Sequence, residues 1–180
     1  MRNFLLIAAA VILVGIISVL VLAALKPARF TIRRSVIIQA PPQKVFALID
    51  DLHRWPEWIP NEGNSAVKRN YSGAPAGRGA VCEWEGTGNA GKGRMEMIES
   101  SPNTIRVQAD WVKPFSARNV NIFTLEPQGN ATQVTWTLDG ENVFMLKAMT
   151  VFTTVDRLMS SHFETGLAGL KAVAEKMPGS

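Results

Sequence analysis

The strongest constraint on this fold lies in the last stretch of the chain, residues 143–177. Apolar side chains recur there at steps of three and four, which is the period of an amphipathic helix. A helix of this length extends about 50 Å and must pack its apolar stripe against a large partner. The sequence therefore predicts one long C-terminal helix. Its apolar stripe comprises Met145, Ala148, Phe152, Val155, Met159, Phe163, Leu167, Leu170, Val173 and Met177.

The middle of the chain has the character of an antiparallel meander. Short segments with strand-like alternation are separated by Gly, Pro, Asn and Ser at intervals of about ten residues. Ahead of them, Pro42 suits the first turn of one short helix, and Pro56 and Pro60 bound a second helix or turn. We expect strands at 30–39, 65–71, 80–85, 91–100, 104–111, 117–127 and 132–139.

This order of elements predicts an α+β fold. A curved seven-stranded antiparallel sheet would wrap around the long C-terminal helix, as one layer packed on another. A sheet that curves so strongly around one helix leaves room for a cavity between the two.

The N-terminal stretch is apolar enough to cross a membrane. Residues 4–25 contain no charge and no proline, and about 20 apolar residues span a hydrocarbon core of about 30 Å. The alternative is a cleaved signal peptide, whose apolar region should be about 7–15 residues long; Ala23 and Ala24 offer only a weak cleavage site. The length favours a retained anchor, with residues 1–29 as anchor and connector and residues 30–180 as one domain.

Charge around this stretch indicates its orientation. Lys26, Arg29, Arg33 and Arg34 follow it, whereas Arg2 is the only basic side chain before it. The positive-inside rule then predicts a single-pass protein whose domain lies in the cytoplasm. The basic cluster also suits anionic headgroups, although two of its arginines could instead belong to the first strand.

Composition excludes several classes of function. The net charge of +4 is too small, and the basic residues too scattered, to indicate nucleic-acid binding. Cys82 is the single cysteine, so no intrachain disulfide can form. The chain has only two histidines, His53 and His162, and these cannot form a thiolate metal site with a single cysteine. We expect no metal and no cofactor, and the sequence names no protein partner.

Five segments carry a resemblance to a known family: 35–46, 50–58, 91–96, 132–136 and 163–171. Taken in order, they resemble the START-like superfamily (SRPBCC), specifically its polyketide cyclase/dehydrase-type members. The resemblance extends over nearly everything after Phe30 and implies a helix-grip fold with a hydrophobic cavity. Related modules include cyclases, lipid carriers, quinone-binding proteins and regulatory proteins, so the resemblance carries over no catalytic residues.

Aromatic and methionine side chains are the candidates for lining such a cavity. Methionine adapts its shape to apolar ligands, and indoles combine apolar area with one polar group. Core packing also explains most aromatic residues, while Trp55 and Trp58 suit a lid or a membrane interface. The candidate lining residues are Trp58, Tyr71, Trp84, Met97, Trp111, Trp136 and Met159.

Three charged residues within strands, Glu85, Arg94 and Glu96, are the weak candidates for catalysis. Alternation places Glu85 and Trp84 on opposite faces of one strand. In the next strand it places Arg94 and Glu96 on one face and Met97 on the other. In one interpretation the charges face water. In the other, a glutamate enters the cavity beside Arg94, where burial would raise its pKa unless it is paired.

Three classes of function follow. The first is a membrane-anchored module that binds an apolar small molecule such as a lipid, polyketide or quinone, with the bilayer as its second partner through residues 4–25. The second is a cyclase/dehydrase-type enzyme acting in the same cavity. The third is a protein-interaction or stress-response module.

Overall fold

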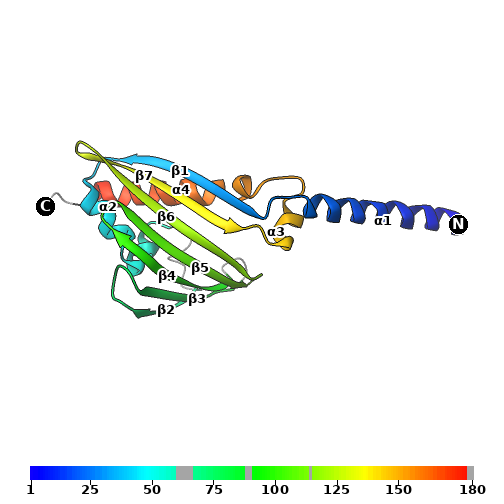
Figure 1. Cartoon of the computed structure of the whole chain (residues 1–180), viewed down its shortest axis with the longest axis horizontal. Coiled ribbons are helices and arrows are strands. Elements are labelled where there is room, and N and C mark those ends of the chain that lie inside the picture. Colours follow the sequence, from blue (N-terminus) through cyan, green and yellow to red (C-terminus); the bar gives the residue numbers. More distant parts are fainter. Residues whose placement is uncertain (60–66, 88–90, 114, 178–180) are drawn as a thin grey trace.

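The computed structural model describes residues 1–59, 67–87, 91–113 and 115–177 of the chain. Its elements form an α+β domain with an N-terminal helix that projects from one end (Figure 1). In order they are α1 (Arg2–Ala24), β1 (Arg29–Ile38), α2 (Pro42–Ile49), the 3₁₀ helix η1 (Leu52–Glu57), β2 (Lys68–Gly73), β3 (Ala80–Glu85), β4 (Lys92–Ser101), β5 (Thr104–Lys113), β6 (Ala117–Gln128), β7 (Ala131–Glu141), α3 (Phe144–Met149) and α4 (Val155–Lys176).

The seven strands form one antiparallel sheet in the order β1-β7-β6-β5-β4-β3-β2. Strands β2 to β7 are a meander, and β1 pairs with the last of them, from Arg29 opposite Glu141 to Ile38 opposite Thr132. The predicted seven-stranded antiparallel sheet is confirmed. The strand expected at 65–71 begins at Lys68 and ends at Gly73, and residues 65 and 66 lie outside the described part of the chain.

The sheet buries one face against α4, which explains the alternation along its strands. On β5, Ile105, Val107 and Ala109 are buried while the residues between them are half-buried. From the other side, α4 contributes Phe163 and Leu170 among its buried side chains. Helix α4 lies across the sheet near β1 and β7 (Figure 1).

An aromatic cluster fills the centre of this interface. Trp136 on β7 stacks on Phe123 of β6, with ring centroids 5.0 Å apart, and contacts Phe163 of α4 at 4.4 Å. Trp58 packs edge-on against Trp136 at 5.9 Å, and Trp55 lies 5.4 Å from Trp58. Such tilted and edge-to-face pairs are favourable beyond the area that they bury.

The expectation that Trp55 and Trp58 form a lid or a membrane interface is wrong. Both side chains are only 3% exposed. The indole of Trp55 donates to the Ile49 carbonyl at 2.8 Å, and the indole of Trp58 donates to the Leu48 carbonyl at 3.2 Å. Because the end of α2 supplies acceptors inside the core, both rings can be buried without an unpaired N–H group.

The expectation of one continuous helix over residues 143–177 is also wrong, because the chain breaks between α3 and α4. The Thr154 side chain accepts a hydrogen bond from the Arg157 amide at 3.1 Å and so begins α4 as an N-cap. The Lys26 ammonium donates to the carbonyls of Thr150 and Thr153. The helical period continues through the break, but a cap and a distant cation satisfy the backbone there.

The N-terminal helix is joined to the domain by several contacts. Leu6–Ala24 has a mean hydropathy of 3.1 and is long enough to cross a membrane, a property that anchors and signal sequences share. Helix α1 packs against α3. The Asn142 side chain and amide donate to the carbonyls of Pro27 and Ala28 at 3.1 and 2.8 Å. The connector is therefore held by hydrogen bonds to the residue that follows β7.

Ionic contacts hold α4 against the edge strand β1. Arg34 binds both carboxylate oxygens of Asp156, at 2.9 and 3.0 Å, and lies 3.6 Å from Glu164. Arg34 therefore belongs to the first strand, β1, and not to a cluster of basic residues that binds lipid headgroups. Lys171 donates to the Ile37 carbonyl at 2.9 Å, further along the same strand.

A charge on the buried stripe of α4 should unfold the domain. Leu170 is fully buried, and an unpaired buried charge costs several kcal/mol out of a typical domain stability of about 5–15 kcal/mol. We expect Leu170→Asp to lower the melting temperature strongly. Ala172→Asp, at an exposed position of the same helix, should cost about 0.7 kcal/mol or less. Equal melting temperatures would contradict the assigned face.

The Arg34–Asp156 pair should make stability depend on acid pH. The hydrogen bond from Arg34 holds the pKa of Asp156 below its ordinary value. The folded state thus binds this proton less readily than the unfolded state, and the stabilisation is lost as pH falls below about 4. In thermal melts, Asp156→Asn should lower the melting temperature near neutral pH. The gap to the wild type should close as pH falls, and a gap that stays constant would argue against the pair.

Candidate ligand-binding site

On the inner face of the sheet, large side chains are less completely buried towards the end where α1 joins the domain. The strand register aligns one row of residues across this end: Trp84, Gly93, Trp111 and Ala117. Trp84 and Trp111 are half-buried. Rows nearer the other end instead hold fully buried residues such as Met97, Ile105 and Val107. The two indoles are thus the large inner-face side chains on β3 to β5 that keep exposed surface.

Trp84 and Trp111 form a pair across β4. Their ring centroids lie 5.0 Å apart at an interplanar angle of 81°. The Trp84 ring occupies the space above Gly93, where a Cβ atom would lie only 2.4 Å from it. Glycine at position 93 therefore lets the indole lie close to the strand and meet Trp111 edge-on. The pair presents a preformed aromatic surface towards the interior.

Two asparagines of β6 add polar groups to the same face. Asn121 is 8% exposed, and its side-chain oxygen accepts a hydrogen bond from the Trp136 indole at 2.9 Å. Asn119 lies one row closer to α1, beside Gly140. Its side-chain oxygen is buried and has no hydrogen-bond partner in the described residues. A buried acceptor without a donor costs free energy unless a ligand or water satisfies it.

The N-terminal half of α4 faces this end of the sheet. Met159 is half-buried and packs against the core. The His162 ring lies 5.9 Å from Trp136 in an edge-on contact, and its side chain is exposed. The described residues contain no group of three metal-ligating side chains. The arrangement therefore offers apolar area, two amides and one imidazole.

Comparison with known proteins agrees with this architecture. The family model for polyketide cyclase/dehydrase and lipid transport matches residues 29–175. This chain belongs to that family. The match begins at the start of β1, ends one residue before the end of α4, and leaves α1 outside it.

Solved structures show the same helix-grip fold at low sequence identity. Protein CV1439 from Chromobacterium violaceum is 17% identical, with a TM-score of 0.59 over 82% of this chain and 99% of its own. TTHA0849 from Thermus thermophilus is 22% identical, with a TM-score of 0.57 over 82% and 100%. The hypothetical protein jhp0584 from Helicobacter pylori is 16% identical, with a TM-score of 0.61 over 81% and 88%. No curated protein matches the chain significantly.

The predicted lining residues of this cyclase/dehydrase-family chain fall into three groups. Trp58, Met97 and Trp136 are 0–3% exposed and belong to the packed core. Tyr71 on β2 is half-buried and stacks on His53 of η1, with centroids 4.0 Å apart. Trp84, Trp111 and Met159 are half-buried, and the two indoles are in direct contact.

The candidate catalytic residues lie on the outer face of the sheet. Glu85 is exposed and accepts a hydrogen bond from Lys92 at 3.1 Å, which lowers the pKa of its carboxyl. Arg94 and Glu96 pair with each other at 2.7 Å, with side chains 39% and 37% exposed. A general acid at neutral pH needs a raised pKa, so the environment of Glu85 is unsuited to that role.

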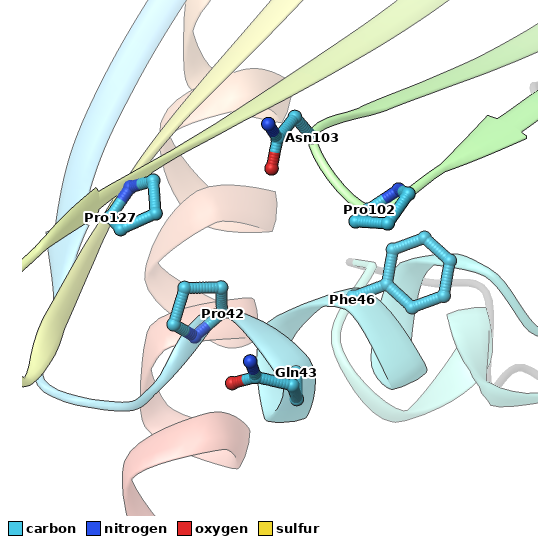
Figure 2. A pocket seen from close by; sticks show the side chains of 6 residues that line it. All are labelled: Pro42, Gln43, Phe46, Pro102, Asn103 and Pro127. Carbon is cyan, nitrogen blue, oxygen red and sulfur yellow. The ribbon is translucent and has the colours of Figure 1, made fainter.

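A separate pocket lies at the opposite end of the domain from α1. It has a volume of about 270 Å³ and combines the start of α2, the β4–β5 turn and the end of β6. Among the described residues, its lining contains no titratable side chain (Figure 2). Its lining residues are Pro42, Gln43, Phe46, Pro102, Asn103 and Pro127.

The alternation of β6 in the sequence already predicts that Asn119 and Asn121 lie on the inner face of the sheet. In β6 they share the alternation of Phe123 and Leu125, which are buried. A period of two alone places Asn119 and Asn121 on the inner face. A polar residue at such a position indicates either a core hydrogen bond or a ligand contact, and Asn121 provides the first.

Proposed function

We propose that this protein is a membrane-anchored module that binds an apolar small molecule bearing a hydrogen-bonding group. The ligand would lie between the N-terminal half of α4 and the inner face of the sheet near α1. The lining in this proposal is Trp84, Trp111 and Met159, with Trp58, Met97 and Trp136 behind them as the packed floor. Tyr71 borders the same face.

One observation carries the proposal. Trp84 and Trp111 face inward from β3 and β5 and contact each other, yet both keep exposed surface. Burying an indole is worth more than burying most side chains, so leaving two of them half-buried forgoes stability. A ligand that covers both rings would recover it. The family description, which includes lipid transport, supports an apolar ligand.

The buried oxygen of Asn119 suggests what the ligand's polar group does. It lacks a donor in the described residues, and a ligand hydroxyl or amide N–H could supply one. This hydrogen bond would favour a hydroxylated ligand over an equally large hydrocarbon, because a buried acceptor without a donor costs about 1–3 kcal/mol.

A cyclase/dehydrase-type reaction in the same site is the second candidate, because the family description names it. Glu85, Arg94 and Glu96 support it poorly, since they face away from Met97 and are paired at the surface. An enzyme would have to use His162 or the asparagines. We therefore favour binding over catalysis.

Anchoring completes the proposal. Helix α1 has 23 residues, or about 35 Å of length, against a hydrocarbon core of about 30 Å. With Lys26 and Arg29 at its C-terminal end, the positive-inside rule favours a cytoplasmic domain. A lipid-like ligand would then enter from the membrane that holds the protein.

Substitution of Trp84 should separate a carrier from an enzyme. Half of an indole surface of about 150–250 Å² is worth about 2–3 kcal/mol at about 25 cal/mol per Å². Losing it should weaken Kd by roughly 20- to 200-fold. After a ligand is found by tryptophan quenching with lipids, quinones and polyketides, Trp84→Ala should weaken binding to this degree. Glu96→Gln, on the outer face, is the control and should bind normally. A His162→Ala or Asn119→Ala variant that binds the ligand normally but no longer converts it would establish the enzyme instead.

Protease treatment of intact spheroplasts tests the location. We expect the domain to be protected until the membrane is broken, and the protein to remain in the membrane after a carbonate wash. Digestion from outside would reverse the orientation. A mature N-terminus near Ala24 would show that α1 is a cleaved signal peptide.

A further inference from the structure

Exposed apolar side chains gather at the corner between α3 and α4. Outside residues 1–25, the described part of the chain leaves seven large apolar side chains exposed, and five of them lie within residues 144–158. Phe152 is the extreme case, at 89% exposure. No residue of α3 is buried. The five are Phe144, Met145, Met149, Phe152 and Leu158, and we call them the apolar corner.

The apolar corner lies where the N-terminal helix meets the domain. Helix α3 packs against α1, close to the C-terminal end of that helix (Figure 1). Ala23, in the last turn of α1, is fully buried. Lys26 donates to the carbonyls of Thr150 and Thr153, so the corner is fastened to the chain just after the helix. The exposed surface of α1 and the apolar corner are thus neighbouring surfaces.

The charges around the apolar corner suit contact with a membrane surface rather than exposure to water. From residue 143 to residue 155 the chain contains no acidic residue, and Lys147 is its single charge. The first carboxylate that follows, Asp156, is neutralised by Arg34. Arg29 and Arg157 flank the corner and are exposed, and exposed Glu141 lies opposite Arg29 in the β1–β7 register. Apolar side chains framed by basic ones are typical of elements that lie in the membrane interface.

We infer that the apolar corner is a second membrane contact, which inserts α3 and the α3–α4 turn into the interface of the bilayer that α1 crosses. The inference rests on the proposed anchoring of α1. Because the connector is held by hydrogen bonds to Asn142, the domain cannot turn freely about its anchor. The two contacts together would fix its orientation, with the Trp84–Trp111 end of the sheet directed at the membrane.

Depth-dependent fluorescence quenching tests this contact in the full-length protein. A nitrobenzoxadiazole label is attached at Phe152→Cys in a Cys82→Ala background, with Ile37→Cys as the control. Ile37 is also exposed, at 46%. It is the last but one residue of β1, a strand that starts beside α1 and ends at the other end of the sheet (Figure 1). Each protein is reconstituted into mixed phosphatidylcholine and phosphatidylglycerol vesicles that carry doxyl-labelled lipids.

We expect the label at position 152 to be quenched at a depth of about 5–10 Å below the headgroups, and the label at position 37 to stay unquenched. In a second experiment, Met149→Glu with Phe152→Glu should reduce the quenching of a label at Leu158→Cys, whereas Ile37→Glu should not. Thermal melts check that each variant is folded.

Two results would overturn the inference, and they are distinguishable. If the protein floats with the vesicles but the label at position 152 is unquenched, α1 is an anchor and the apolar corner is not a membrane contact. In that case, oxidation of the unlabelled Phe152→Cys variant to a disulfide between two chains would assign the corner to a second copy. If the protein does not float with the vesicles, the anchoring proposal and this inference are both wrong.

Discussion

The whole domain depends on covering one face of a curved seven-stranded sheet. Helix α4 covers the part near β1 and β7, held by Phe163 and Leu170 in the core and by the Arg34–Asp156 pair at its rim. The tryptophans of residues 52–58 cover the centre because α2 provides acceptors for their indole N–H groups. The remaining part of the inner face, around Trp84 and Trp111, is covered less completely, and both indoles are only half-buried.

This uneven coverage connects stability with function. Large aliphatic and aromatic side chains fill the rows far from α1, where the domain gains its stability from burial. Small residues such as Gly93 and Ala109 occur nearer α1, and the indoles there lie close to the sheet and partly exposed. Our proposals place the ligand and the membrane at this same end. The junction of Lys26, Asn142 and α3 would keep the two aligned, because it leaves the connector little freedom.

The outer face of the sheet has a different role. Its charges pair with one another along and across the strands, as Arg94 does with Glu96 and Arg118 with Asp110 at 2.6 Å. Such exposed pairs contribute little stability, but they keep a broad sheet surface soluble. A strand-borne glutamate is therefore weak support for catalysis unless its position on the inner face is known.

The sequence alone determined the element order, the antiparallel sheet and the apolar face of α4, because these follow from periods of two and of three to four residues. Strand β3 coincides with its predicted range. Only the tertiary structure decided where the C-terminal helix breaks, since Lys26 reaches the break from more than a hundred residues away. It likewise buried Trp58 while leaving Trp84 half-buried. Periodicity identifies which face a side chain is on, but how far that face is filled depends on partners from distant parts of the chain.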